Sequence, residues 1–101
     1  MTKKQVLCWT TVDAGLRVYF SKNLMNVLGV GIGDRVSFDT SGRYVKVVPA
    51  ENNGQKIDTR QRVCLPKEVT RRLKLDIGTD VIFLQRGKNV RVCRLDNAIR
   101  W

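Results

Sequence analysis

Basic side chains with the spacing needed to bind a polyanion are concentrated in the second half of this 101-residue chain. Lys67, Arg71 and Lys74 would lie together on one side of a helix, opposite Val69 and Leu73. Just upstream, strand alternation would bring four more polar residues onto one face: Lys56, Asp58, Arg60 and Arg62. Such a stripe can neutralise several phosphates, and an arginine can also bind a guanine edge through two hydrogen bonds.

The overall charge supports a polyanionic partner. Nineteen Lys and Arg residues against nine Asp and Glu residues give a formal net charge of +10. Residues 1–50 carry seven basic and three acidic side chains (+4), and residues 51–101 carry twelve and six (+6). A basic helix face is by itself more often a solvated surface, but a surplus of this size raises the local concentration of nucleic acid. We therefore expect a nucleic-acid partner, bound mainly by the second half.

The residues needed for catalysis or metal binding are scarce. The chain has no histidine, and its three cysteines, Cys8, Cys64 and Cys93, are far apart and outside any paired motif. We expect them to be small apolar side chains in a reducing cytoplasm, and we expect no enzyme activity, no metal and no cofactor. Asp13 and Asp58 are interpreted as turn residues that orient a nearby arginine rather than as catalytic acids.

The chain consists of two similar halves. Residues 12–47 align with residues 57–92 at a constant offset of 45, without gaps, and 12 of the 36 pairs are identical. Unrelated segments of this length would agree at roughly 2 or 3 positions. Each copy is too short to bury an adequate core alone, so the copies must share one core or recruit another chain. We predict a single domain over residues 1–101, with repeats at about 6–48 and 55–94 and a linker at 49–54.

Each copy has the pattern strand, strand, helix, hairpin. The first strands are expected at 6–12 and 55–58 and the second at 16–20 and 61–65, with Val18, Phe20, Val63 and Leu65 pointing inward. Ser21 and Pro66 favour helix starts, and Gly29 or Lys74 would end those helices. Two Val-rich hairpins close the copies through turns at Gly42 and Gly87. The sequence therefore predicts a mainly β fold with short helices.

These elements carry a family resemblance. Residues 62–69 read Arg-Val-Cys-Leu-Pro-Lys-Glu-Val, and residues 73–81 supply Leu-x-Leu-x-Ile-Gly before a Val-rich hairpin. This pattern resembles the AbrB-type swapped-hairpin family, and residues 17–36 resemble it more loosely, with Ser21 in place of the proline. The resemblance implies a swapped-hairpin AbrB-like barrel, built from two tandem β-β-α-β-β repeats that interlock and bind double-stranded DNA. It implies a monomeric pseudo-dimer or a homodimer, and a cytoplasmic, nucleoid-associated transcriptional regulator.

The resemblance also assigns binding residues. Arg17 and Arg62 fall on the family's DNA-contacting strand arginine. Of the places for its other arginines, only Arg71 is basic here; the rest are Met25, Asn26, Thr70, Thr10 and Gln55. The first helix offers little beyond Lys22, so an asymmetric surface is expected. The residues predicted to bind DNA are Arg17, Arg62, Arg60, Lys67, Arg71, Lys74, Lys22 and Lys56.

Other residues receive weaker interpretations. Four hairpin cations are expected to point outward and prevent edge pairing: Arg43, Lys46, Lys88 and Arg91. Trp9 and Trp101 are expected to pack. An alternative function is a protein-interaction module, antitoxin-like or an inhibitor docking on a host protein, through an apolar patch of Met25, Val27 and Tyr19. RNA binding is a further alternative, because positive charge does not distinguish the nucleic acid.

Overall fold

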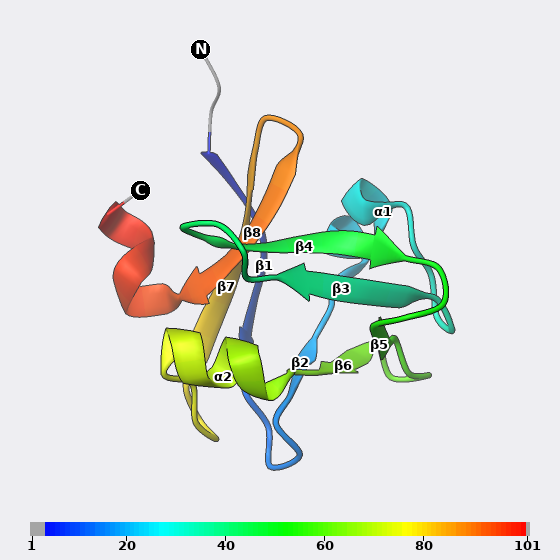
Figure 1. The fold of residues 1–101 in the computed structure, drawn as a ribbon, viewed down its shortest axis with the longest axis horizontal. Helices are drawn as coiled ribbons and strands as arrows, with labels where there is room; N and C mark the ends of the chain where they lie inside the picture. The colour runs from blue at the N-terminus through cyan, green and yellow to red at the C-terminus, as the bar shows by residue number, and fades with distance from the viewer. Residues whose placement is uncertain (1–3, 101) are drawn as a thin grey trace.

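Residues 4–100, which the computed structural model describes, form eight strands, two α-helices and one 3-10 helix (Figure 1). Side chains are described for residues 5–97. In chain order the elements are β1 (Lys4–Thr11), β2 (Arg17–Tyr19), α1 (Lys22–Leu28), β3 (Arg35–Asp39), β4 (Val45–Ala50), β5 (Gln55–Lys56), β6 (Arg62–Cys64), α2 (Lys67–Leu73), β7 (Asp80–Arg86), β8 (Asn89–Arg94) and η1 (Leu95–Arg100). The fold is therefore mainly β with short helices, as predicted.

Both helices begin and end at positions that are 45 residues apart. Ser21 caps α1, because its hydroxyl accepts a hydrogen bond from the backbone N–H of Leu24 at 3.2 Å. Pro66 holds the same capping position before α2, one residue earlier than the first turn in which it was expected. Gly29 ends α1 and Lys74 ends α2 in left-handed conformations, with φ of 71° and 55°. The predicted ends are confirmed, although Lys74 adopts a conformation that usually favours glycine.

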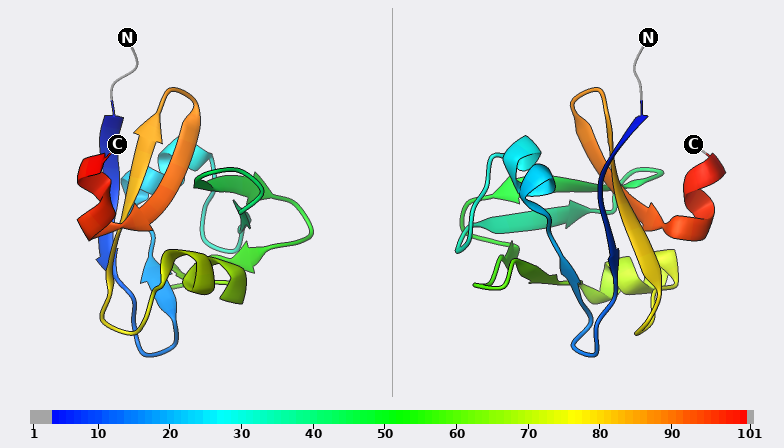
Figure 2. Two further views of the ribbon diagram at one scale, coloured as in Figure 1. Left: turned by 60° about the vertical axis from the view of Figure 1, so that its left-hand side comes forward. Right: turned by 180° about the vertical axis from the view of Figure 1, so that it is seen from behind.

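The strands form a curled, six-stranded antiparallel sheet and a separate two-stranded ribbon. The sheet has the order β1-β7-β8-β4-β3-β5, and the ribbon pairs β2 with β6. Four of the six strand pairings among the described residues join different halves: β1 with β7, β8 with β4, β5 with β3, and β2 with β6. The sheet curls into a half-barrel, and the ribbon lies on its inner side (Figures 1 and 2). Neither half could form this sheet alone.

The pairing is nearly symmetric between the halves. In the ribbon Val18 lies opposite Val63, its own equivalent 45 residues later. In the sheet Lys46 lies opposite Arg91, which is again its own equivalent. A pseudo-twofold axis therefore passes between the members of both pairs. Two backbone hydrogen bonds are related by the same axis. The Phe20 N–H donates to the Gln61 carbonyl at 2.7 Å, and the Leu65 N–H donates to the Leu16 carbonyl at 2.9 Å.

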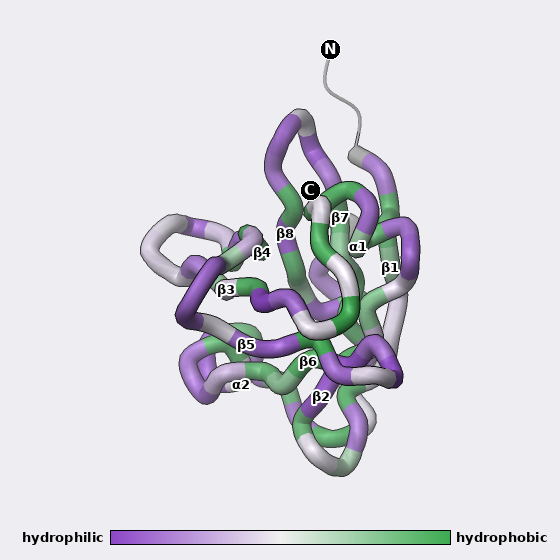
Figure 3. Tube along the Cα trace, turned by 90° about the vertical axis from the view of Figure 1, so that its right-hand side faces the viewer, coloured by the Kyte–Doolittle hydropathy of each residue, from purple (hydrophilic) through white to green (hydrophobic). Residues whose placement is uncertain are grey.

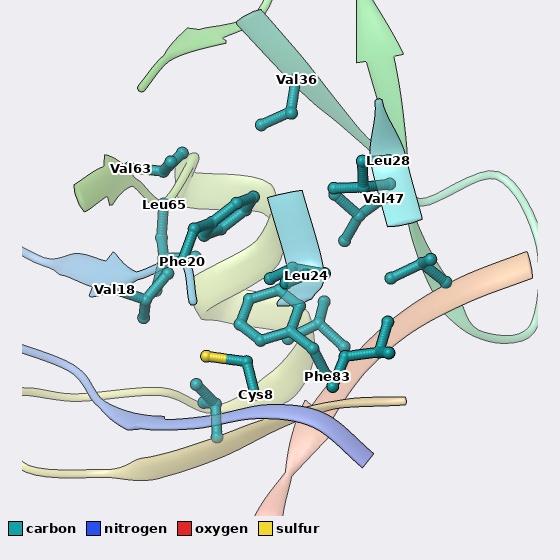
Figure 4. Packing of buried hydrophobic residues seen from close by; sticks show 14 of the residues in the cluster. Cys8, Val18, Phe20, Leu24, Leu28, Val36, Val47, Val63, Leu65 and Phe83 are labelled. Carbon is teal, nitrogen blue, oxygen red and sulfur yellow. The ribbon is translucent and has the colours of Figure 1, made fainter. Parts of the chain in front are cut away.

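One apolar core lies between the ribbon and the sheet and draws on both halves (Figure 4). The ribbon contributes Val18 and Val63, each at most 1% exposed. Phe20 from the first half meets Phe83 from the second with ring centroids 5.1 Å apart and an interplanar angle of 65°. Edge-to-face packing of this kind adds stability beyond the buried area. The halves therefore share one core, and the inward-facing residues predicted for β2 and β6 are confirmed.

A smaller apolar cluster lies on the outer face of the sheet. Ile82, Leu84 and Cys93 are buried there, and Leu95 of η1 packs on them. Trp9 of the edge strand β1 lies opposite Ile82 but remains 64% exposed, so the prediction that it packs is wrong. Trp101 lies outside the described residues. No helix among the described residues has the length and apolar character needed to cross a bilayer.

Gly54 provides a test of the crossing between halves, because it precedes β5 directly. Its φ is +105°, and a Cβ added there would lie 2.4 Å from the carbonyl oxygen of Val36. We expect Gly54→Ala to destabilise the protein by about 2 kcal/mol or more in urea denaturation, because neither the Gly54 backbone nor the Val36 carbonyl can move freely. Gly29→Ala is the control: φ is +71° but nothing lies within 4 Å, so a loss of about 1 kcal/mol is expected. An equal loss for both variants would contradict the tight contact.

Candidate nucleic-acid interface

The ribbon presents four side chains on its outward face. Because Val18 and Val63 point into the core, alternation turns Arg17 and Tyr19 of β2 outward, together with their counterparts in β6. In register, Arg17 lies opposite Cys64, and Tyr19 lies opposite Arg62. The two arginines are thus diagonal neighbours across the pseudo-twofold axis. Their side chains are 34% and 27% exposed, and the Nε atom of each is buried.

Each arginine is held by a turn that contains an aspartate. One Asp13 carboxylate oxygen accepts backbone hydrogen bonds from Gly15 and Arg17, both at 2.9 Å. The Asp58 carboxylate accepts the equivalent bonds from Arg60 at 2.9 Å and Arg62 at 2.8 Å. The interpretation of both aspartates as turn residues is confirmed. These turns fix the start of each ribbon strand, and with it the direction in which the arginine leaves the backbone.

The second carboxylate oxygens join the two turns into one charged cluster. Asp13 Oδ2 lies 3.2 Å from Arg17 Nε and 3.5 Å from Arg62 Nη1, so one carboxylate contacts arginines of both halves. Asp58 Oδ2 lies 3.8 Å from Arg62 Nε. The two carboxylates balance the charges of the two guanidinium groups. The cluster therefore orients the guanidinium groups more than it adds net positive potential. The contact between Asp13 and Arg62 joins residues 49 apart and is not visible in the sequence pattern.

Both carboxylates have pKa values below the usual 3.8. Partial burial raises the pKa of Asp13, but the backbone N–H groups of its turn and the guanidinium of Arg17 outweigh this effect. The backbone N–H of Arg62 has the largest effect on the pKa of Asp58 and lowers it; partial burial opposes this, and the charges of Arg62 and Arg17 lower it further. Both carboxylates are therefore ionised at neutral pH.

These lowered pKa values predict a dependence of stability on acidity. Because the folded-state pKa values of Asp13 and Asp58 lie below the unfolded value, their contribution is present above about pH 4 and is lost as the pH falls through the folded values. We expect the melting temperature to drop below about pH 4, and the double variant Asp13→Asn, Asp58→Asn to drop less steeply. Thermal melts by circular dichroism measure both.

The matched control for the pH experiment is Asp76→Asn, which removes an exposed carboxylate that forms none of the ion pairs of the ribbon cluster. This variant should retain the wild-type slope of melting temperature against pH. If the double ribbon variant also retained the full slope, the carboxylates of the cluster would not stabilise the fold in the way described.

The other predicted binding residues lie on elements that flank the ribbon. Arg60 is exposed in the turn before β6, Lys56 is exposed in β5, and Lys22 is exposed in the first turn of α1. Lys67, Arg71 and Lys74 are exposed on or at the end of α2, which follows β6 directly (Figure 1). The basic side of α2, opposite the buried Val69, is therefore present. Whether these residues bind DNA stays a prediction.

One predicted arrangement is wrong. β5 ends at Lys56, Ile57 is fully buried, and residues 58–61 form a turn in which the Gln61 N–H donates to the Asp58 carbonyl at 2.9 Å. Strand alternation therefore does not extend from residue 56 to residue 62. The side chains of Asp58 and Arg62 come together through the turn and the ion pair, not through a shared strand face.

Cys64 is also placed differently from the prediction. Cys8 and Cys93 are buried, as expected of small apolar side chains, whereas Cys64 is exposed beside Arg17 on the ribbon. Cys64 lies on the outward face of β6, because the adjacent Val63 points into the core. Within the described part of the chain, no group of three or more His, Cys, Asp or Glu residues is placed to hold a metal ion.

No protein-family model, curated protein or solved structure matches this chain. The interface consists of two arginines at equivalent positions, each fixed by an aspartate turn, on a ribbon that crosses a pseudo-twofold axis. Basic residues are more numerous on the side of the second half.

The apolar patch expected for protein docking is not formed as predicted. Met25 is 8% exposed and belongs to the core, because α1 turns it inward next to Leu24. Val27 and Tyr19 remain 39% and 43% exposed. Tyr19 lies on the outward face of the ribbon, opposite Arg62, and therefore belongs to the basic surface rather than to a separate apolar one.

Arg72 has a structural role that the sequence pattern did not indicate. Its guanidinium donates hydrogen bonds to the carbonyls of Thr40, Gly42 and Arg43 in the turn between β3 and β4, the last at 2.8 Å. It thus fastens α2 of the second half to the hairpin of the first. The equivalent residue of α1 is Val27, which cannot form such bonds. Among the basic residues of α2, Arg72 therefore has a structural role, whereas the other exposed residues are not bonded to this turn.

Proposed function

We propose that this chain is a small double-stranded DNA-binding protein that acts as a transcriptional regulator of AbrB-like type. The observation that carries the proposal is the pair Arg17 and Arg62. They occupy equivalent positions on the outward face of one ribbon, each oriented by its own aspartate turn. Duplex DNA has local twofold symmetry, so two arginines related by a pseudo-twofold axis can approach equivalent groups on its two strands.

The arrangement of strands agrees with a swapped-hairpin barrel. Each half contributes a hairpin, β3-β4 or β7-β8, that pairs with the first strand of the other half. We propose that this is the AbrB-type interlocked arrangement, formed within one chain. The proposal is supported by the equivalent positions of the elements and by the sequence resemblance around Arg17 and Arg62.

Two kinds of contact are proposed for the bound state. The exposed cations of α2 and of the Asp58 turn bind phosphates, because they are solvated and can exchange counterions without breaking an ion pair. Arg17 and Arg62 enter a groove, because the aspartates hold each guanidinium in a fixed direction and a fixed fork suits recognition of a base edge. Binding is expected to be stronger on the side of α2 than on the side of α1.

Fluorescence anisotropy with labelled oligonucleotides tests this function. A 20-base-pair duplex should bind at low salt, and affinity should fall steeply between about 50 mM and 200 mM salt, as expected when several phosphates are neutralised. Single-stranded DNA and duplex RNA of the same length are the comparison ligands. Absence of binding at low salt, or affinity independent of salt, would refute the proposal, and a clear preference for RNA would favour an RNA-binding function instead.

A further inference from the structure

The second end of the pseudo-twofold axis is also cationic. The axis leaves the molecule at the ribbon and, on the opposite side, between Lys46 of β4 and Arg91 of β8. Val45 and Val92 point inward, into the same core that Val18 enters from the ribbon. Because the sheet and the ribbon enclose one core, their outward faces point in opposite directions. The ribbon and this surface are therefore separate.

The sheet order gives this second surface its significance. In the six-stranded order, β8 and β4 are the two central strands, so Lys46 and Arg91 guard no edge. The prediction that they prevent edge pairing is therefore wrong. Two like charges directly opposite each other in neighbouring strands are unfavourable for the sheet. A sequence that places cations at both equivalent positions tolerates that cost, which points to a role outside folding.

Two further cations complete the surface symmetrically. Arg43 and Lys88 are equivalent residues, each exposed in the turn of its hairpin. Lys88 and Lys46 line one hollow of about 200 Å³, and Arg43 lines an equivalent hollow of about 310 Å³ beside Val92. The Arg91 guanidinium stacks on the ring of Tyr44 at 4.3 Å, which holds its charge beside the second hollow. We call these four residues, Arg43, Lys46, Lys88 and Arg91, the distal surface.

One carboxylate offsets part of the charge of the distal surface. Asp39 of β3 lies opposite Lys46; hydrogen bonds from the hydroxyl and the backbone N–H of Ser41, at 2.6 and 2.9 Å, lower its pKa, and the charge of Lys46 lowers it further, so it offsets one of the four cations. The next cation along the β7-β8 hairpin is Arg86, also exposed. Figure 3 shows that the tip of this hairpin is strongly hydrophilic. The partner that matches such a surface is a phosphate backbone, because a second copy of this chain would bring +10 against +10.

We propose that the distal surface binds the phosphate backbone of a second duplex, so that one protein molecule bridges two DNA segments. The inference rests on the proposed function of the ribbon. Base reading is not part of the proposal, since two of the four cations of the distal surface are lysines, which lack the planar fork of an arginine. Its contribution is electrostatic and decreases with salt.

A two-duplex capture assay tests the bridging. A biotinylated duplex is immobilised on beads, the protein is added, and retention of a second, fluorescent duplex is measured at about 50 mM salt. The wild type should retain the second duplex. Lys46→Gln with Arg91→Gln, and separately the exposed pair Arg43→Gln with Lys88→Gln, should reduce this retention about tenfold. Both variants should keep their affinity for a single duplex within about threefold in the anisotropy titration.

The control variant is Arg35→Gln with Arg94→Gln, which removes two positive charges at neither end of the axis and should bridge like the wild type. Melting curves check that each variant is folded; removal of the like-charged pair is not expected to lower the melting temperature by more than a few degrees. Sedimentation of the protein alone shows whether bridging occurs through a protein dimer, which would overturn the proposal.

The outcomes separate the two proposals. A wild type that binds one duplex but retains no second duplex overturns the bridging and leaves the proposed function intact. Unchanged retention by both distal variants overturns it as well. A wild type that binds no duplex refutes the proposed function and the bridging together. If the distal variants lost all duplex binding while Arg17→Ala and Arg62→Ala lost none, the sole DNA site would lie on the distal surface. That result would overturn both proposals.

Discussion

Arg62→Ala is expected to weaken duplex binding by about tenfold to a hundredfold, because a guanidinium that recognises a base edge through two bonds contributes about 1–3 kcal/mol. Arg62 has the most connected position of the interface: it faces Tyr19 in the ribbon and contacts the carboxylates of both Asp13 and Asp58. Combined with Arg17→Ala, the loss should leave only salt-sensitive, non-specific binding. Anisotropy titrations at two salt concentrations measure both the affinity and its salt slope.

Three further variants distinguish orientation from charge. Arg62→Lys keeps the charge but loses the planar fork, so it should retain the salt slope and lose discrimination between duplex sequences. Arg71→Ala should reduce affinity and the salt slope together, as expected for a phosphate contact on α2. Lys22→Ala on α1 should have the smallest effect. Equal losses for the α1 and α2 variants would contradict the asymmetry of the interface.

Phe20→Ala is expected to remove a large part of the free energy of unfolding. The Phe20 side chain is fully buried, and its ring packs edge-to-face on Phe83 of the other half. Removal of such a side chain typically costs about 3–5 kcal/mol, against a total stability of about 5–15 kcal/mol for a small domain. Tyr19→Ala is the adjacent control: the side chain is 43% exposed, and a loss below about 1 kcal/mol is expected.

The packing of Phe20 on Phe83 also predicts that the two halves unfold together. Amide hydrogen exchange of the wild type should show the slowest exchange in β7 and in the central strands β4 and β8, with a common free energy of opening. In Phe20→Ala, protection should be lost in both halves at once. Persistent protection of one half in this variant would show that the halves have separate cores and would contradict the single shared core.

Much of the local structure follows from the sequence. The constant offset of 45 predicted equivalent helices, and α1 and α2 occupy them because Ser21, Gly29 and the apolar spacing act locally. The inward direction of Val18 and Val63 also follows from alternation within a short strand. These features depend on residues within one turn or one strand, so a single sequence contains enough information.

The errors concern contacts made over long distances in the chain. Strand order decides whether Lys46 and Arg91 guard an edge, and that order depends on pairing between halves. Trp9 was expected to pack but lies on the edge strand β1, and Met25 was expected to be exposed but turns into the shared core. Arg72 finds its three carbonyl partners about 30 residues away. None of these contacts leaves a periodic signal in the sequence.

The candidate site was predicted in part. The pairing of Arg17 and Arg62 followed from the repeat, and the aspartate turns followed from residue type. The assumed alternation from Lys56 to Arg62 failed because the chain turns after Ile57. The contact of Asp13 with both arginines was not predictable, since it depends on the register of β2 against β6.

The most direct test of the central proposal is a titration of the isotopically labelled protein with a short duplex, followed through backbone amide chemical shifts by NMR. Binding by the ribbon predicts that the first shifts to change, at substoichiometric duplex, belong to Arg17, Tyr19, Arg62 and the amides of α2. Changes at β4 and β8 should follow only with excess duplex. Shift changes confined to β7, η1 or the distal surface, with the ribbon amides unmoved, would contradict the account.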